Sequence, residues 1–114
     1  MQTQNKLQET KYTDQQIEKS ELIQSKGWLL LEFGENWCPI CQQAQPLIAA
    51  ALLSFPELKR KMIIDGKGKR LGRLLKVKLW PSLILLYNGE TKGTLVRPNS
   101  QLQIESWLNE IKNT

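Results

Sequence analysis

The two cysteines of this chain, Cys38 and Cys41, lie three positions apart where one hydrophobic pattern gives way to another. Before them, residues 28–33 form an apolar run interrupted only by Glu32, which is typical of a strand covered on both faces. After them, apolar residues recur at helical spacing through residues 40–55. The pattern therefore predicts a buried strand, a short loop and an amphipathic helix whose first turn holds the cysteines.

Patterns elsewhere predict strands and helices in alternation. Thr13 with a glutamine three positions later fits a capping box, so a helix is expected to begin there and to end at Gly27. Asn88-Gly89 is a signal for a tight hairpin turn. Further elements are expected at residues 62–65 (strand), 71–75 (helix), 82–87 and 93–96 (strands) and 104–111 (helix). This order predicts an α/β fold with a central mixed sheet of four to five strands and helices on both faces.

The length of 114 residues suits one domain. Residues 1–12 are polar and aperiodic, so we expect a flexible N-terminal segment or a weak edge strand there, followed by a domain at residues 13–114. No apolar run approaches the roughly 18 residues that a membrane helix needs. The first residues also lack the apolar stretch of a secretory signal. These features favour a cytoplasmic protein without membrane contact, or a periplasmic one if a signal was removed before this numbering begins.

The net charge of +5 is unevenly distributed. Residues 59–78 contain nine basic residues against one acidic residue, Asp65. Nucleic-acid binding needs such a stripe, but no nucleic-acid motif is present, so a solvated basic face is the preferred interpretation. Neighbouring parallel strands end at the same edge of a sheet. Lys67, Lys69 and Arg70 are therefore expected to form a positive rim near the cysteine loop.

The cysteine pair allows three interpretations. A structural zinc site usually needs four ligands from cysteine and histidine, and this chain has two cysteines and no histidine. A structural disulfide would close a very small loop and stabilise little. A redox pair has a physical mechanism, because the N-terminus of a helix stabilises the thiolate of Cys38, and Cys41 lies one turn later. The redox interpretation is favoured.

The segment Phe33-Gly-Glu-Asn-Trp-Cys-Pro-Ile-Cys41, preceded by an apolar strand with one acid, resembles the active-site region of the thioredoxin family. The resemblance continues through Pro46 inside the following helix, and through residues 61–65, 76–82 and 85–90. It implies a thioredoxin-like fold for residues 13–114. It also implies a C-P-I-C active site, which differs from the Gly-Pro dipeptide of thioredoxins proper.

The resemblance implies a role for each residue of a catalytic group. Cys38 is the exposed nucleophile and Cys41 the buried resolving thiol. Glu32 takes the place of the buried acid that exchanges a proton with the resolving thiol, and Lys61 takes the place of the lysine that partners this acid. A carboxylate inside an apolar strand independently suits such a proton shuttle, because burial disfavours its charged form.

A substrate-binding surface around the thiols is also implied. Pro81 would be a cis-proline, leaving the backbone of Trp80 free to pair with an extended substrate segment. Arg97 stands where the family usually has a glycine beside the active site. The expected substrate-binding residues are Trp37, Pro39, Ile40, Trp80, Pro81, Val96 and Arg97.

The implied function is the reduction of protein disulfides, without a bound cofactor or metal. The expected partners are protein disulfide substrates and an electron donor, either a thioredoxin reductase-like enzyme or another dithiol, with the chain acting as a monomer. Two alternatives remain open at this point. One is a disulfide oxidase or isomerase, and the other is a protein-binding module that docks a partner on Trp37 and Trp80 with little turnover.

Overall fold

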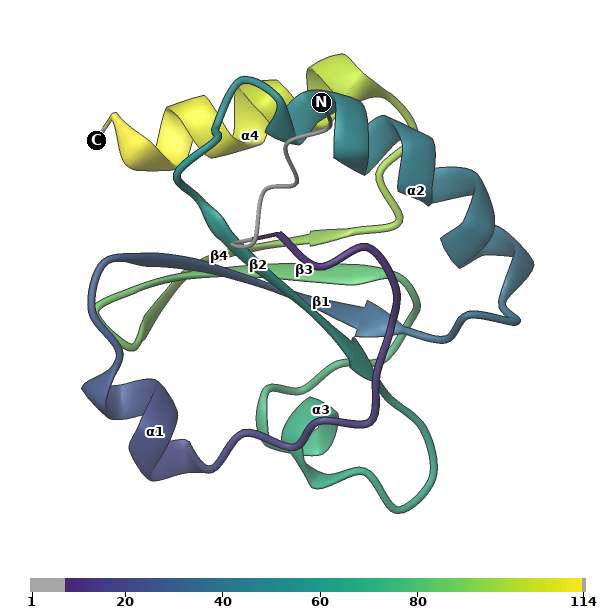
Figure 1. Ribbon diagram of the computed structural model, residues 1–114, viewed down its shortest axis with the longest axis vertical. Helices are drawn as coiled ribbons and strands as arrows, with labels where there is room; N and C mark the ends of the chain where they lie inside the picture. The colour runs from purple at the N-terminus through teal and green to yellow at the C-terminus, as the bar shows by residue number, and fades with distance from the viewer. Residues whose placement is uncertain (1–7, 114) are drawn as a thin grey trace, which may run out of the picture.

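The computed structural model describes residues 8–113 and shows a four-stranded sheet between two layers of helices (Figure 1). The strand order is β2-β1-β3-β4, in which β1 is parallel to β2 and antiparallel to β3, and β3 is antiparallel to β4. The expected mixed sheet with helices on both faces is confirmed. The strands are β1 (Trp28–Gly34), β2 (Lys59–Ile64), β3 (Ser82–Tyr87) and β4 (Glu90–Val96), and the helices are α1 (Lys19–Gln24), α2 (Pro39–Leu52), α3 (Arg70–Leu74) and α4 (Gln101–Lys112).

Strand β1 lies inside the sheet, and its side chains alternate between the two helical layers. Leu29 and Leu31 join the cluster that includes residues of α1 and α3, whereas Leu30 joins the cluster that includes residues of α2 and α4. The period of two along a strand then carries Glu32 to the side of Leu30, beneath α2. The same alternation that buries the apolar run therefore buries its one charge.

Helix α2 covers this face of the sheet because its apolar residues form one stripe. Ala44, Ile48, Ala51 and Leu52 are buried in the helix, and the α4 residues Ile104 and Leu108 complete the same cluster. Burying a leucine or isoleucine side chain stabilises a fold by about 1.5–3 kcal/mol. The stripe fixes α2, and with it the cysteines of its first turn, against β1.

Within residues 8–113, no helix combines the length and the hydrophobicity needed to cross a membrane.

The predicted first helix begins later than expected. Thr13 pairs with β2 instead: its amide donates to the Met62 carbonyl at 3.1 Å, and its carbonyl accepts from the Ile64 amide at 2.9 Å. Helix α1 begins at Lys19, where the Glu21 side chain accepts from the amide of Glu18. Thr13-Gln16 has the composition of a capping box, but the free edge of β2 offers its backbone stronger pairing partners.

Residues 8–12 run beside β2 as an irregular edge, which favours the edge-strand alternative for this stretch. Gln8 forms a parallel bridge with Arg60, and the Glu9 amide donates to the Arg60 carbonyl at 3.1 Å. The packed unit therefore includes residues before the expected boundary at Thr13. The rest of the predicted N-terminal segment, residues 1–7, lies outside the described residues.

The hairpin between β3 and β4 docks onto the turn between α1 and β1. Asn88 and Gly89 both have positive φ, 52° and 82°, which confirms the predicted turn. The Asn88 side chain accepts from the Gly27 amide at 2.8 Å. A Cβ atom on Gly89 would lie 2.4 Å from the carbonyl oxygen of Leu22. Gly89 is thus required twice, by its φ angle and by close backbone contact.

The two demands on Gly89 can be separated by comparison with Gly68, which has nearly the same φ, 83°, but no atom within 4 Å of an added Cβ. Gly68→Ala should cost only the conformational penalty, about 1–2 kcal/mol of unfolding free energy. Gly89→Ala should cost about 1–3 kcal/mol more, because the α1 backbone must move. Urea unfolding of both variants measures the difference. Equal costs would show that the hairpin does not press on α1.

Candidate active site

Cys38 is the N-cap residue of α2, directly after the loop that leaves β1. Its backbone is extended, at φ −77° and ψ 119°, and Pro39 is the first residue of the helix. The Cys38 Sγ accepts a hydrogen bond from the amide of Cys41 at 3.3 Å. This amide is one of those that a helix N-terminus leaves unpaired, so the Cys38 sulfur lies at the positive end of the helix dipole.

Both thiols are free. Cys41 is fully buried, as expected, but Cys38 is only 7% exposed, so its description as an exposed nucleophile is wrong. Both pack in one cluster with Tyr12, Met62 and Trp80. Burial raises the pKa of the Cys41 thiol to about 12, and its hydrogen bond with Cys38 adds to this effect. One turn of helix thus separates a thiol held near the surface from one that resists ionisation.

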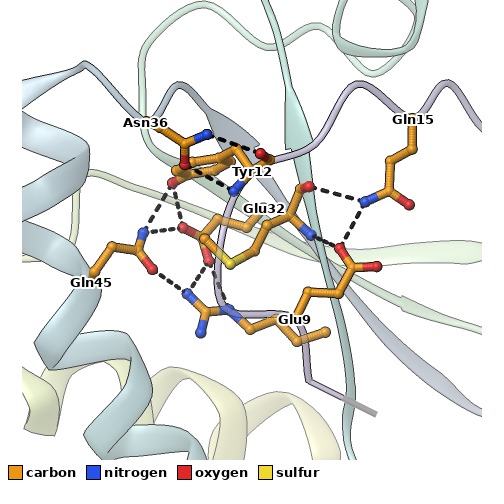
Figure 2. A network of polar contacts seen from close by, with 8 residues as sticks. Glu9, Tyr12, Gln15, Glu32, Asn36 and Gln45 are labelled. Carbon is orange, nitrogen blue, oxygen red and sulfur yellow. Dashed lines mark hydrogen bonds and ion pairs between the residues drawn. The ribbon is translucent and has the colours of Figure 1, made fainter. Parts of the chain in front are cut away.

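Glu32 lies fully buried beneath α2 and is surrounded by donors (Figure 2). Its Oε1 accepts from Arg60 Nε at 2.9 Å and from Arg60 Nη2 at 2.6 Å. Its Oε2 accepts from the Tyr12 hydroxyl and from Gln45 Nε2, the latter at 2.5 Å. Arg60 Nη2 also donates to Gln45 Oε1 at 2.7 Å. Charge-assisted bonds of this kind can hold an ionised carboxylate inside an apolar core.

The partner of Glu32 is Arg60, and the assignment of Lys61 to this role is wrong. In the parallel register of β1 and β2, Glu32 lies opposite Met62. Side chains alternate along β2, so Arg60 and Met62 share the face beneath α2, whereas Lys61 falls on the opposite face. Arg60 is only 3% exposed. Residues 59–61 are all basic, so only the register of β2 against β1 decides which of them faces Glu32. A shift of one residue in this register would move each side chain to the other face of the sheet.

Tyr12 is a residue of this site that the sequence analysis missed, because it lies in a polar segment. Its backbone is fixed to the cysteine loop: the Tyr12 amide donates to Asn36 Oδ1 at 3.0 Å, and Asn36 Nδ2 donates to the Tyr12 carbonyl at 2.9 Å (Figure 2). Its side chain is 3% exposed and packs with Cys41. Burial and the nearby Glu32 raise the pKa of the Tyr12 hydroxyl far above its ordinary value.

Gly34 is the sequence signal that could have revealed this packing. A Cβ atom on Gly34 would lie 2.7 Å from Cys41 Sγ and 2.8 Å from the Tyr12 hydroxyl oxygen. Its φ is not positive, so the glycine is needed here for space and not for backbone conformation. A glycine at the end of a buried strand indicates that something large approaches the backbone there.

An apolar surface adjoins the thiols. The Trp80–Pro81 peptide bond is cis, as the resemblance implies. Trp37 is 65% exposed and meets Trp80 edge to face, with ring centroids 5.8 Å apart. The Trp80 indole is held by a hydrogen bond from Nε1 to Asp65 Oδ2 of 2.9 Å. Of the other predicted substrate-binding residues, Pro39, Ile40 and Val96 are exposed, and Pro81 is buried.

Arg97 changes the expectation for the Trp80 backbone. It follows β4 with a positive φ of 49°, at the position where a glycine was expected. Its amide donates to the Pro81 carbonyl at 2.9 Å, and its Nε donates to the Trp80 carbonyl at 2.7 Å. One of the two acceptor positions of the Trp80 carbonyl is therefore taken by an exposed side chain of the same chain.

The basic run at residues 59–78 does not form one solvated face, because Arg60 points into the core. Lys69 lies 2.9 Å from Asp14, and Arg70 lies 3.8 Å from Glu18. Both acids belong to the segment before α1. The positive rim near the thiols remains a prediction, and ion pairs offset two of its three charges.

Comparison with known proteins places this site in a family. The family model described as Thioredoxin matches residues 8–110. The chain is 29% identical over 99 residues to the thioredoxin of Buchnera aphidicola subsp. Schizaphis graminum (strain Sg), covering 86% of this chain and 91% of that protein. The structure of thioredoxin 2 from Pseudomonas aeruginosa PAO1 in its reduced form superposes with a TM-score of 0.82 at 38% identity, covering 91% of this chain and 96% of that one.

A further solved structure shares the fold at lower identity. Mitochondrial thioredoxin 3 from Saccharomyces cerevisiae, in its oxidized form, superposes with a TM-score of 0.63 at 20% identity, covering 82% of this chain and 84% of that one.

The register of β2 can be tested by removing each candidate partner of Glu32. Arg60→Met should lower the unfolding free energy by about 3–5 kcal/mol, because it leaves a buried carboxylate without its cation. Lys61→Met is the matched control, and it should change stability by no more than about 0.5 kcal/mol. Denaturant unfolding at neutral pH gives both values. A larger loss from Lys61→Met than from Arg60→Met would contradict the assignment.

Proposed function

This chain belongs to the thioredoxin family and carries the dithiol pair of a protein-disulfide reductase, and we propose that Cys38 acts as the nucleophile and Cys41 as the resolving thiol. The observation that carries this proposal is the contrast between the two sulfurs. Cys38 caps a helix and accepts from an amide, whereas Cys41 is fully buried with a raised pKa. Such a contrast suits two steps that use the thiols in order.

In the first step the Cys38 thiolate attacks one sulfur of a substrate disulfide. A Cys38–substrate mixed disulfide forms, the substrate S–S bond breaks, and the other substrate sulfur leaves as a thiolate. The helix N-terminus supports this step, because its amides stabilise the negative charge before attack. Cys38 keeps 7% of its surface exposed, whereas Cys41 has none, so Cys38 is the cysteine that a substrate can approach.

In the second step Cys41 attacks the Cys38 sulfur, which forms the Cys38–Cys41 disulfide and releases the second substrate thiolate. The pair loses two electrons and the substrate disulfide gains them. A thiol with a pKa of about 12 is hardly ionised at neutral pH, so the step needs a proton acceptor. Glu32 is the carboxylate of the buried network beside Cys41, and we assign the acceptor role to it, with Arg60 in place of Lys61 as its cation.

The substrate would lie across the exposed residues around the thiols, against Trp37 and Ile40 on one side and Val96 on the other. An extended segment that pairs with the Trp80 carbonyl would share this oxygen with the Arg97 side chain or displace it. The electron donor, the monomeric state and the cytoplasmic location remain predictions.

Reduction of insulin disulfides with dithiothreitol as the donor tests the proposal. The wild-type chain should catalyse turnover, and Cys41→Ser should lose it. Incubated with insulin in the absence of dithiothreitol, the reduced Cys41→Ser chain should accumulate mixed disulfides, because the thiol that releases the product is gone. Cys38→Ser is the matched control and should form no mixed disulfide with the same substrate. Absence of turnover in the wild-type chain would favour the protein-binding module. Mixed disulfides formed by Cys38→Ser but not by Cys41→Ser would reverse the two roles.

The direction of the reaction follows from the reduction potential. The sequence contains no histidine to pair with the Cys38 thiolate, and Cys38 caps the N-terminus of α2. We expect a potential between about −270 and −200 mV, the range from thioredoxin to glutaredoxins. Equilibration with glutathione redox buffers measures it. A value near −120 mV, about that of a strong oxidase, would assign the oxidising direction instead.

A further inference from the structure

The Tyr12 hydroxyl lies next to both Glu32 and Cys41. It donates a hydrogen bond to Glu32 Oε2 (Figure 2). On its other side, the hydroxyl oxygen and Cys41 Sγ both lie within 2.8 Å of the point where a Cβ on Gly34 would stand. In residues 8–113, no direct hydrogen bond joins Cys41 to Glu32, so the tyrosine is the group that links the thiol to the carboxylate.

The hydrogen-bonding capacity of the hydroxyl fits such a link. A tyrosine hydroxyl has one donor and two acceptor positions. The donor is directed to Glu32, and one acceptor position is taken by Gln45 Nε2 at 3.1 Å. The second acceptor position faces no other donor among the described residues, and Tyr12 packs against Cys41. A proton path from the Cys41 S–H to the Tyr12 oxygen would continue through the hydrogen bond from the Tyr12 O–H to Glu32 Oε2.

We propose that Tyr12 is a catalytic residue of the resolving step, which relays the proton of Cys41 to Glu32. The inference rests on the proposed function of the cysteine pair. As Cys41 Sγ attacks Cys38 Sγ of the mixed disulfide, its proton passes to the Tyr12 oxygen and the Tyr12 proton passes to Glu32 Oε2. The Cys38–Cys41 bond forms, the bond to the substrate sulfur breaks, and the substrate leaves as a thiolate. Tyr12 ends the step neutral, as it began.

The two transfers must be concerted. The pKa of Tyr12 lies far above its ordinary value because of burial, so a free tyrosinate does not form at any step. The contact with Tyr12 lowers the pKa of Cys41 against the effect of burial, so the two groups are close enough to interact. The carboxylate does not move to accept the proton, because Arg60 holds its other oxygen.

The site is built to hold Tyr12 in this place. Two hydrogen bonds tie its backbone to Asn36 in the cysteine loop, and Gly34 leaves room for its ring beside Cys41. A buried tyrosine hydroxyl takes hydrogen-bond partners in any protein, so what distinguishes Tyr12 is its place between Cys41 and Glu32. The geometry therefore points to a function of the hydroxyl.

Tyr12→Phe removes this hydroxyl and keeps the ring. The probe is dithiobis-nitrobenzoate, a symmetrical disulfide that releases one coloured thiolate when Cys38 attacks and a second when Cys41 resolves the mixed disulfide. Single-turnover absorbance measurements should show an unchanged first release. The second release should slow by about 100-fold at neutral pH, the low end of what general acid–base catalysis contributes. Its rate should also rise in proportion to hydroxide concentration, because Cys41 must then lose its proton to solvent.

Tyr87→Phe is the matched control, since Tyr87 is exposed at the end of β3 and packs on Trp28. It should change neither release. Glu32→Gln should slow the second release like Tyr12→Phe, and combining the two changes should add no further loss, because one path is lost in each case. An unchanged second release and pH profile in folded Tyr12→Phe would overturn the relay. Failure of the proposed function is distinguishable, because the wild-type chain itself would then release no second thiolate.

Discussion

The buried ion pair of Glu32 and Arg60 is the interaction on which the rest of the site depends. An ionised carboxylate in a dry core is costly unless its lone pairs are satisfied. Here the four donor contacts to Glu32 come from three separate parts of the chain: β2, α2 and the edge segment before α1. Each of these parts is therefore held in place by its hydrogen bonds to the Glu32 carboxylate. The network helps to fix α2 over β1, favours the observed register of β2, and stabilises the packing of residues 8–12 beside the sheet.

This dependence explains which features could be predicted from the sequence. The strand, cysteine loop and helix at residues 28–55 were predicted because hydrophobic period and cap chemistry are local signals. The hairpin at Asn88-Gly89 was predicted for the same reason. Arg60 and Tyr12 were missed because their roles come from pairing between distant segments. No local pattern distinguishes Arg60 from Lys61, since only the register of β2 against β1 determines which one faces Glu32.

The first helix shows the converse case, in which a local sequence signal is present but the structure does not follow it. Thr13-Gln16 has a strong local signal for a helix start, and the tertiary structure overrides it. The edge of β2 has unpaired backbone groups, and pairing with Thr13 satisfies them. The Arg97 side chain likewise donates a hydrogen bond to the Trp80 carbonyl, and no sequence pattern predicts this contact. Where backbone groups of one segment need partners, the choice among distant candidates depends on the assembled fold.

Under the proposed relay, Glu32 and its partners must both hold a charge and receive a proton, and the asymmetry of the network reconciles these demands. Arg60 bonds one carboxylate oxygen of Glu32, and Tyr12 and Gln45 bond the other. Proton arrival at Oε2 neutralises Glu32 and leaves the buried Arg60 without a counter-charge, which is unfavourable in a low-dielectric core. In the proposed relay, loss of this proton after the substrate thiolate leaves would restore the ion pair. A buried acid with a fixed cation is suited to accept a proton in one step of a catalytic cycle and to be ionised again before the next.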